Sequence, residues 1–162
     1  MTRDCDGDLP VLAFLQRAID GTLSPDDTTH LTYPTPISRL LGFELVGVSE
    51  RAAEVRFVAD VSRHGNQQGT LHGGMLCELA DAAMGTAHST AIVAGESFTS
   101  LDLDARFLRP VWSGPLIARA RCTHAGRTIS HYACDVLRED GKPVASFTSA
   151  ILTLRGDAAT GR

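Results

Sequence analysis

Most of the second half of the chain alternates between apolar and polar positions. Four segments after residue 96 show this pattern, namely residues 98–108, 115–125, 127–137 and 143–154. In the first segment, one side of the alternation carries Leu101, Leu103, Ala105 and Phe107. A period of two is typical of strands that bury one face, and Gly126 and the pair Asp140–Gly141 mark hairpin turns between the last three segments. The pattern predicts four antiparallel strands.

The first half of the chain changes period twice. Residues 43–48 and 52–60 are two candidate strands joined by a short turn, and a polar loop follows over residues 62–70. Residues 71–93 then show a helical period. Five small or apolar residues of this segment fall within about a third of the helical wheel: Leu76, Leu79, Ala80, Ala83 and Ala87. The segment is predicted to form one long helix with a narrow, small-sided apolar face.

The N-terminal region is predicted to hold two short helical pieces around a linker. In residues 9–20 one stripe carries Leu12, Leu15 and Ile19, and a glycine follows at position 21. A polar, proline-containing linker comes next, and Thr35 with Pro36 is typical of a capped helix start. This second piece is expected to run through residue 41 and to end at the glycine of position 42. The expected divisions are an extension over residues 1–35, one domain over 36–155 and a flexible tail over 156–162.

Together these elements predict an α+β architecture in which a curved antiparallel sheet of about six strands wraps one central helix. A sheet with one apolar face must cover it, and only one long helix is available for this. The alanine-rich face of that helix allows the sheet to close tightly. The arrangement resembles a hotdog fold, with an extra N-terminal helix.

Composition excludes several classes of protein. The chain has 162 residues, 43% of them hydrophobic and 21% charged, which is typical of a globular domain. Fifteen basic residues against nineteen acidic ones give a net charge of −4, which argues against nucleic acid or an anionic membrane as the main partner. Its apolar runs fall short of the roughly 20 residues of a membrane span. The first ten residues show no apolar run of a signal peptide, so a cytoplasmic protein is expected.

Metal and triad chemistry are not indicated. The four cysteines lack a CxxC spacing and are expected to be reduced thiols. Asp81 and His88 share a helix face but are seven residues apart, about 10.5 Å, too far for one metal ion. The G-x-S-x-G elbow of α/β-hydrolases is missing as well. No metal and no cofactor are expected.

Candidate chemistry gathers at the start of the long helix. Gly73 and Gly74 open this helix, where free N–H groups and the helix dipole favour a developing oxyanion. A side chain at Gly73 would stand between those groups and a ligand. Asp81 lies away from the apolar face, between Gly74 and Gly85, which leaves room for a ligand beside its carboxylate. Glu78 lies on nearly the same face and is the rival carboxylate.

The spacing Asn66-x2-Gly69-x2-His72-Gly73-Gly74-x6-Asp81 resembles the acyl-CoA thioesterases of the hotdog superfamily, in particular the phenylacetate-pathway and 4-hydroxybenzoyl-CoA groups. The resemblance covers roughly residues 36–154 and includes ARFLRPV, HAGRT and EDGKPVAS. It implies that an amide at Asn66 and the backbone N–H of Gly73 serve the thioester carbonyl, and that Asp81 attacks or activates water.

The resemblance also implies a hydroxyl that positions the water, at Ser100 or at the adjacent Thr99. For His72 two roles stay open, general base or orientation of the turn. Three arginines are candidates for the phosphates of coenzyme A, which need charge-assisted contacts: Arg106, Arg109 and Arg127.

The expected reaction is hydrolysis of an acyl-CoA to free acid and coenzyme A. A thiolate of pKa about 8.5 leaves readily, so one carboxylate with an oxyanion hole can suffice. The alternatives are a hotdog hydratase or dehydratase, which would use His72 as its base, and an acyl-thioester-binding module without catalysis.

Each active site is expected to be shared between two subunits. Gly73 and Asp81 are eight residues apart, about 12 Å along a straight helix, but a reacting carbonyl must lie about 3 Å from both groups. Two helices related by a dyad remove this conflict. A homodimer or dimer of dimers is therefore expected, in which Asn66 and Gly73 of one subunit work with Asp81 and Ser100 of its neighbour.

Overall fold

The computed structural model describes residues 7–160 of the chain. Its helices are α1 (Val11–Asp20), α2 (Pro36–Leu41), α3 (Val61–His64), α4 (Gly73–Ser89) and a 3₁₀ turn, η1 (Gly156–Ala159). Its strands are β1 (Glu44–Ser49), β2 (Ala52–Ala59), β3 (Ser97–Ser100), β4 (Asp104–Phe107), β5 (Gly114–Ala125), β6 (Ile129–Arg138) and β7 (Pro143–Leu154). None of the helices within residues 7–160 is long and apolar enough to cross a membrane.

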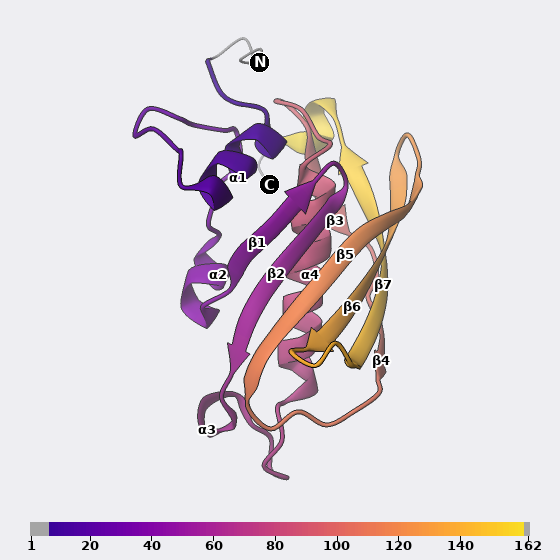
Figure 1. Cartoon of the computed structure of the whole chain (residues 1–162). Coiled ribbons are helices and arrows are strands. Elements are labelled where there is room, and N and C mark those ends of the chain that lie inside the picture. The colour runs from indigo at the N-terminus through magenta and orange to yellow at the C-terminus, as the bar shows by residue number, and fades with distance from the viewer. Residues whose placement is uncertain (1–6, 161–162) are drawn as a thin grey trace.

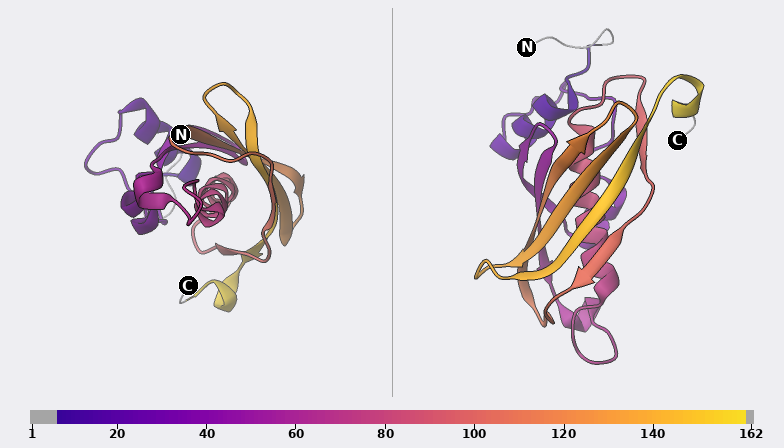
Figure 2. Two further views of the ribbon diagram at one scale, coloured as in Figure 1. Left: turned by 90° about the horizontal axis from the view of Figure 1, so that it is seen from below. Right: turned by 90° about the vertical axis from the view of Figure 1, so that its right-hand side faces the viewer.

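The strands form one antiparallel sheet that curls around α4. Their order is β1-β2-β5-β6-β7-β3, and β4 also pairs with β7 beside β3. Seen along its axis in the left view of Figure 2, α4 lies inside the curve of the sheet. The predicted hotdog fold is therefore confirmed, and so are the hairpins at Gly126 and at Asp140–Gly141.

The core forms between the inner face of the sheet and the predicted apolar face of α4. All five predicted positions of this face are buried, and Leu79, Ala80, Ala83 and Ala87 are completely so. Met84 is also fully buried at the margin of the same face. Because the alanines are small, the aromatic residues of the opposing strands can pack close to the helix axis.

The prediction of one strand over residues 98–108 is wrong in one respect. The structure has two short strands there, β3 and β4, with a break between them. At the break, the Asp102 carboxylate accepts the backbone N–H of Ala150 at 2.8 Å, and Ser149 Oγ donates to the Asp102 carbonyl, also at 2.8 Å. These side-chain bonds replace the regular ladder with β7. The apolar side of the predicted strand is therefore only partly a core face: Leu103 packs against the core, whereas Leu101 and Phe107 are 51% and 56% exposed.

The N-terminal region packs on the domain as an outer layer beside β1, where α1 lies in Figure 1. Leu15 is buried as predicted, but Ile19 of the same predicted stripe is 36% exposed, and Val11 and Ala13 are buried in its place. The second helix, α2, has the predicted bounds, and the Thr35 side chain accepts the N–H of residue 38 as its cap. The short helix α3 and the turn η1 were not predicted.

Candidate active site

The first turn of α4 carries an N–H group that is free to bind a ligand. His72 is the N-cap, and its Nδ1 accepts the N–H of Gly74 at 3.0 Å. Within the described residues nothing accepts the N–H of Gly73, as expected for the first turn of a helix. A Cβ at Gly73 would lie 3.0 Å from Phe107 Cζ, so the position has little room for a side chain. This geometry gives His72 the turn-orienting role.

Asn66 lies in the loop before this helix and holds the loop in shape. Its Oδ1 accepts the backbone N–H groups of Gln68 and Thr70, at 2.9 and 3.2 Å, and its Nδ2 donates to Thr70 Oγ1 at 3.0 Å. Asn66, Gly73 and Phe107 line one cavity of about 350 Å³. The amide and the helix N-terminus therefore belong to the same part of the molecule.

Asp81 lies two turns further along α4 and is paired with Ser100 at the end of β3. Ser100 Oγ donates to Asp81 Oδ1 at 2.9 Å. The adjacent Thr99 instead directs its hydroxyl to the Ser100 carbonyl, at 3.4 Å, because neighbouring residues of a strand point to opposite faces. Of the two hydroxyls left open by the sequence, Ser100 is the one beside the carboxylate.

A second cavity, of about 330 Å³, contains Gly74, Asp81 and Ser100, and also Glu78. Partial burial raises the pKa of the Glu78 carboxyl, and the negative charge of Asp81 raises that pKa further. Cys77 lines the same cavity, and burial raises the pKa of its thiol, which keeps the sulfur in the neutral form. These contacts mark Asp81 as the carboxylate with a polar partner.

One chain does not bring the two halves of the predicted site together. Gly73 and Asp81 lie on one uninterrupted helix of 17 residues, which puts them about 12 Å apart along its axis. They also line different cavities, Gly73 with Asn66 and Asp81 with Ser100. The reacting group of a single substrate cannot contact both within one chain.

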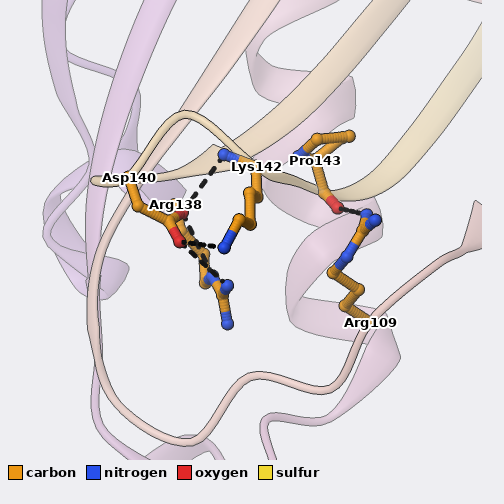
Figure 3. Close-up of polar contacts among 5 residues, drawn as sticks. All are labelled: Arg109, Arg138, Asp140, Lys142 and Pro143. Atoms are coloured by element: carbon orange, nitrogen blue, oxygen red, sulfur yellow. Dashed lines mark hydrogen bonds and ion pairs between the residues drawn. The ribbon is translucent and has the colours of Figure 1, made fainter.

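The three candidate arginines are not gathered in one place. Arg106 and Arg109 lie on and just after β4, and Arg109 Nη1 donates to the carbonyl of Pro143 at 2.5 Å (Figure 3). Arg127 lies in the turn before β6, so the whole of this ten-residue strand, about 30 Å, separates it from that contact.

Two further cations lie at the turn between β6 and β7, which Arg109 contacts through the Pro143 carbonyl. Arg138 and Lys142 both pair with Asp140, at 3.1 and 3.4 Å (Figure 3). This group was not predicted from the sequence, although the EDGK turn that carries it was recognised. The contact of Phe107 with Gly73 was also missed, and no local signal could have revealed a contact across 34 residues of chain.

Metal ligands do not cluster in the part of the chain that is described. Across residues 7–160 no group of three or more His, Cys, Asp or Glu side chains could hold a metal ion. Cys77, Cys122 and Cys134 are free thiols, and Cys5 lies outside the described residues.

Comparison with known proteins assigns the family. A model of the thioesterase superfamily matches residues 68–145. A Haemophilus influenzae protein that carries the name esterase is 33% identical over 137 residues, which are 82% of this chain and 96% of that protein. A solved thioesterase structure from Haemophilus influenzae has a TM-score of 0.70 and 29% identity over 75% of this chain and 85% of its own. The chain belongs to the thioesterase superfamily.

A further solved structure is the E. coli PaaI protein from the phenylacetic acid degradation operon. It has a TM-score of 0.69 and 26% identity, and the match covers 76% of this chain and 87% of that one. Family and fold together identify the protein as a hotdog enzyme that hydrolyses thioesters.

Proposed function

We propose that the protein is an acyl-CoA thioesterase in which Asp81 is the catalytic carboxylate. The observation that carries this assignment is the hydrogen bond from Ser100 Oγ to Asp81 Oδ1, 2.9 Å long, in a cavity open at the surface. A carboxylate held by one hydroxyl keeps lone pairs free for chemistry. Asp81 acts on the thioester carbon as nucleophile or activates the water that does so, and Ser100 holds the carboxylate or its water in place.

The oxyanion is assigned to the start of α4. As the carbonyl carbon becomes tetrahedral, its oxygen gains negative charge, and the free N–H of Gly73 together with the helix dipole stabilises that charge. Asn66 supports the site by holding the loop that leads into the helix, and its Nδ2 retains a second hydrogen for the carbonyl oxygen. His72 acts as the cap that fixes the first turn.

Each site is assigned to two subunits. The 12 Å between Gly73 and Asp81 requires a second copy, which brings its helix start beside the Asp81 cavity. Around the sites a single chain exposes large apolar side chains, which supports such an interface: Leu101 at 51%, Phe107 at 56%, Leu108 at 49% and Trp112 at 59%. The assembly is a homodimer or a dimer of dimers.

Coenzyme A is the proposed carrier of the acyl group, and no separate cofactor is needed. Its phosphates are assigned to arginines on the surface, Arg109 with Arg106 near one end of the sheet and Arg127 at the other. In a dimer, arginines from opposite ends of two chains can serve one substrate. The proposed location is the cytoplasm.

The test is thiol release from a panel of acyl-CoA thioesters at neutral pH. Hydrolysis releases free coenzyme A, which a thiol reagent reports, and a blank with enzyme but no substrate controls for reaction of the reagent with the enzyme's own thiols. A hydratase would change an enoyl bond without releasing thiol, and a binding module would do neither. Absence of thiol release from every member of the panel would overturn the proposal.

A further inference from the structure

A third cavity, of about 340 Å³, lies between α4, β1 and the N-terminal region. We call it the N-terminal pocket. Its outer wall is formed by Phe14, Ala18 and Ile19 of α1, and its inner wall includes Ala82 and Thr86 of α4. Its volume lies within the range of small-molecule sites. Neither the proposed chemistry nor the match to residues 68–145 accounts for the outer wall.

Several polar side chains at the rim of this pocket already have partners. The hydroxyls of Thr35 and Ser38 are 2.8 Å apart, and the Glu44 carboxylate pairs with Arg56 at 2.8 Å. These groups need no hydrogen bond from a ligand, and the rest of the pocket wall is mainly apolar. An apolar ligand gains from burial there, whereas a polar one would lose its hydration without a partner.

The outer wall is fixed in place at both ends. Arg17 of α1 pairs at 2.8 Å with Asp27, whose side chain is only 1% exposed. Further along, Tyr33 OH donates to Ser89 Oγ at the end of α4, 2.5 Å away, and burial raises the pKa of this phenol. The wall is therefore a built part of the molecule, and its position limits what the pocket can hold.

The pocket and the Asp81 carboxylate lie on neighbouring faces of one helix. Thr86 follows Asp81 by five residues, which is about 7.5 Å along the axis. Gly85, one turn after Asp81, adds no side chain of its own between the two faces, and the Phe98 ring of β3 lies beside it, with Cε2 3.6 Å from where a Cβ would stand. A thioester whose carbonyl is at Asp81 can thus lay its acyl group across Gly85 and into the pocket.

We infer that the N-terminal pocket binds the acyl group of the substrate, an apolar group of up to about ten heavy atoms at about 30 Å³ each, and that α1 sets its maximum length. This inference rests on the proposed thioesterase function. It makes residues 11–35, outside the matched family region, the specificity-determining part of the enzyme.

The experiment compares acetyl-, hexanoyl- and decanoyl-CoA as substrates of the full chain and two variants. Ala18→Trp fills the pocket from α1, and Gln16→Trp puts the same side chain on the opposite, exposed face of that helix as a matched control. In the native protein kcat/KM is expected to rise with chain length, by about fourfold per methylene buried. Ala18→Trp should lower the ratio of kcat/KM for decanoyl- to acetyl-CoA at least about tenfold, and Gln16→Trp should leave this ratio unchanged.

A binding measurement separates this inference from the function on which it rests. Decanoyl-CoA and acetyl-CoA are each titrated by calorimetry into the Asp81→Asn variant and into the Asp81→Asn/Ala18→Trp double variant. Decanoyl-CoA should bind more tightly than acetyl-CoA to the first protein, whose pocket is open, and not to the second, whose pocket is filled. Hydrolysis with an unchanged chain-length ratio in Ala18→Trp would overturn the inference and leave the function intact. Chain-length-dependent binding without hydrolysis would overturn the function and leave the pocket assignment. A change of oligomeric state in Ala18→Trp, with the ratio unchanged, would identify the pocket as a contact between copies and overturn the inference.

Discussion

Asp81 and Glu78 are two carboxylates in one cavity, and their surroundings differ. Asp81 receives a hydrogen bond from Ser100, whereas burial and the charge of Asp81 raise the pKa of Glu78. A raised pKa makes the Glu78 carboxyl readier to take up a proton than an ordinary glutamate. This asymmetry is why we assign the anionic, reactive role to Asp81 and give Glu78 none.

Asp81→Asn is expected to lower kcat at least about a hundredfold, because the amide keeps the size and the contact with Ser100 but loses the negative charge. The matched control is Glu78→Gln, which removes one carboxylate from the same cavity and should lower kcat only a few-fold. Steady-state kinetics on one acyl-CoA measures both. Near-native turnover in Asp81→Asn with a large loss in Glu78→Gln would reverse the assignment.

Gly73→Val is expected to lower kcat by about 10²–10³, because a branched side chain blocks the approach of the carbonyl to the helix N-terminus. The new Cβ would also lie 3.0 Å from Phe107 Cζ, which is the far end of a flexible side chain, so a small shift of that ring should let the variant fold. Circular dichroism and thermal melting check folding, and Gly73→Ala should show a smaller loss of activity. An active, folded Gly73→Val enzyme would mean that the oxyanion is held elsewhere.

At the scale of elements, α4 is held to the sheet by a buried polar contact as well as by its apolar face. His88, 1% exposed, places Nδ1 at 3.1 Å from Tyr132 OH on β6 and Nε2 at 3.0 Å from Thr153 Oγ1 on β7. Burial, with the nearby charge of Arg51, lowers the pKa of His88 to about 4. The imidazole is therefore neutral in the folded protein at neutral pH.

This contact predicts a loss of stability in mild acid. As the pH falls below about 6.5, His88 becomes protonated in the unfolded chain, but in the folded chain it stays neutral down to pH about 4. The free energy of unfolding therefore falls between pH about 6.5 and about 4 and does not change above this window. The fall is expected to be up to about 1.4 kcal/mol per pH unit. Urea denaturation at pH 7.5, 6 and 5 measures it, with His88→Gln as the comparison. Equal pH dependence in both proteins would contradict the prediction.

The elements that could be predicted from the sequence are those fixed by residues close together in the chain. Period-two alternation and the glycine turns predicted β5, β6 and β7, and the cap Thr35 predicted α2, because these signals act within a few residues. The break between β3 and β4 depends on Asp102 reaching Ala150, 48 residues away, which no local pattern contains. The buried face of α1 was misjudged for the same reason, since β1 decides which side is covered.

The residues of the candidate site show the same difference between local and long-range signals. The spacing from Asn66 to Asp81 lies within one loop and one helix, so its members could be named from the chain alone. The choice of Ser100 over Thr99 required the register of β3 against β7, which brings Ser100 opposite Ile151. The separation of Arg127 from Arg109 required the length of a strand between them.

At the scale of the whole molecule, the enzyme is expected to need two copies, and mixed dimers test this. When Gly73→Val and Asp81→Ala chains with different tags are co-expressed, each mixed dimer has one site with both lesions and one with none. About half of the native activity per mixed dimer should return, although each parent is inactive. Purification by both tags followed by kinetics measures it, and mixed dimers as inactive as their parents would exclude shared sites.

The break at Asp102 has a consequence for how the molecule behaves in a crowded solution. The long strand β7 is covered on its outer side by two strands of four residues each, β3 and β4. An uncovered edge of full length would offer a template on which further chains could add without limit. Because the ladder is interrupted at Asp102, an incoming strand finds only short runs of unpaired backbone groups at this edge. The Asp102 carboxylate thereby limits edge-to-edge strand addition on the β3 and β4 side of the sheet.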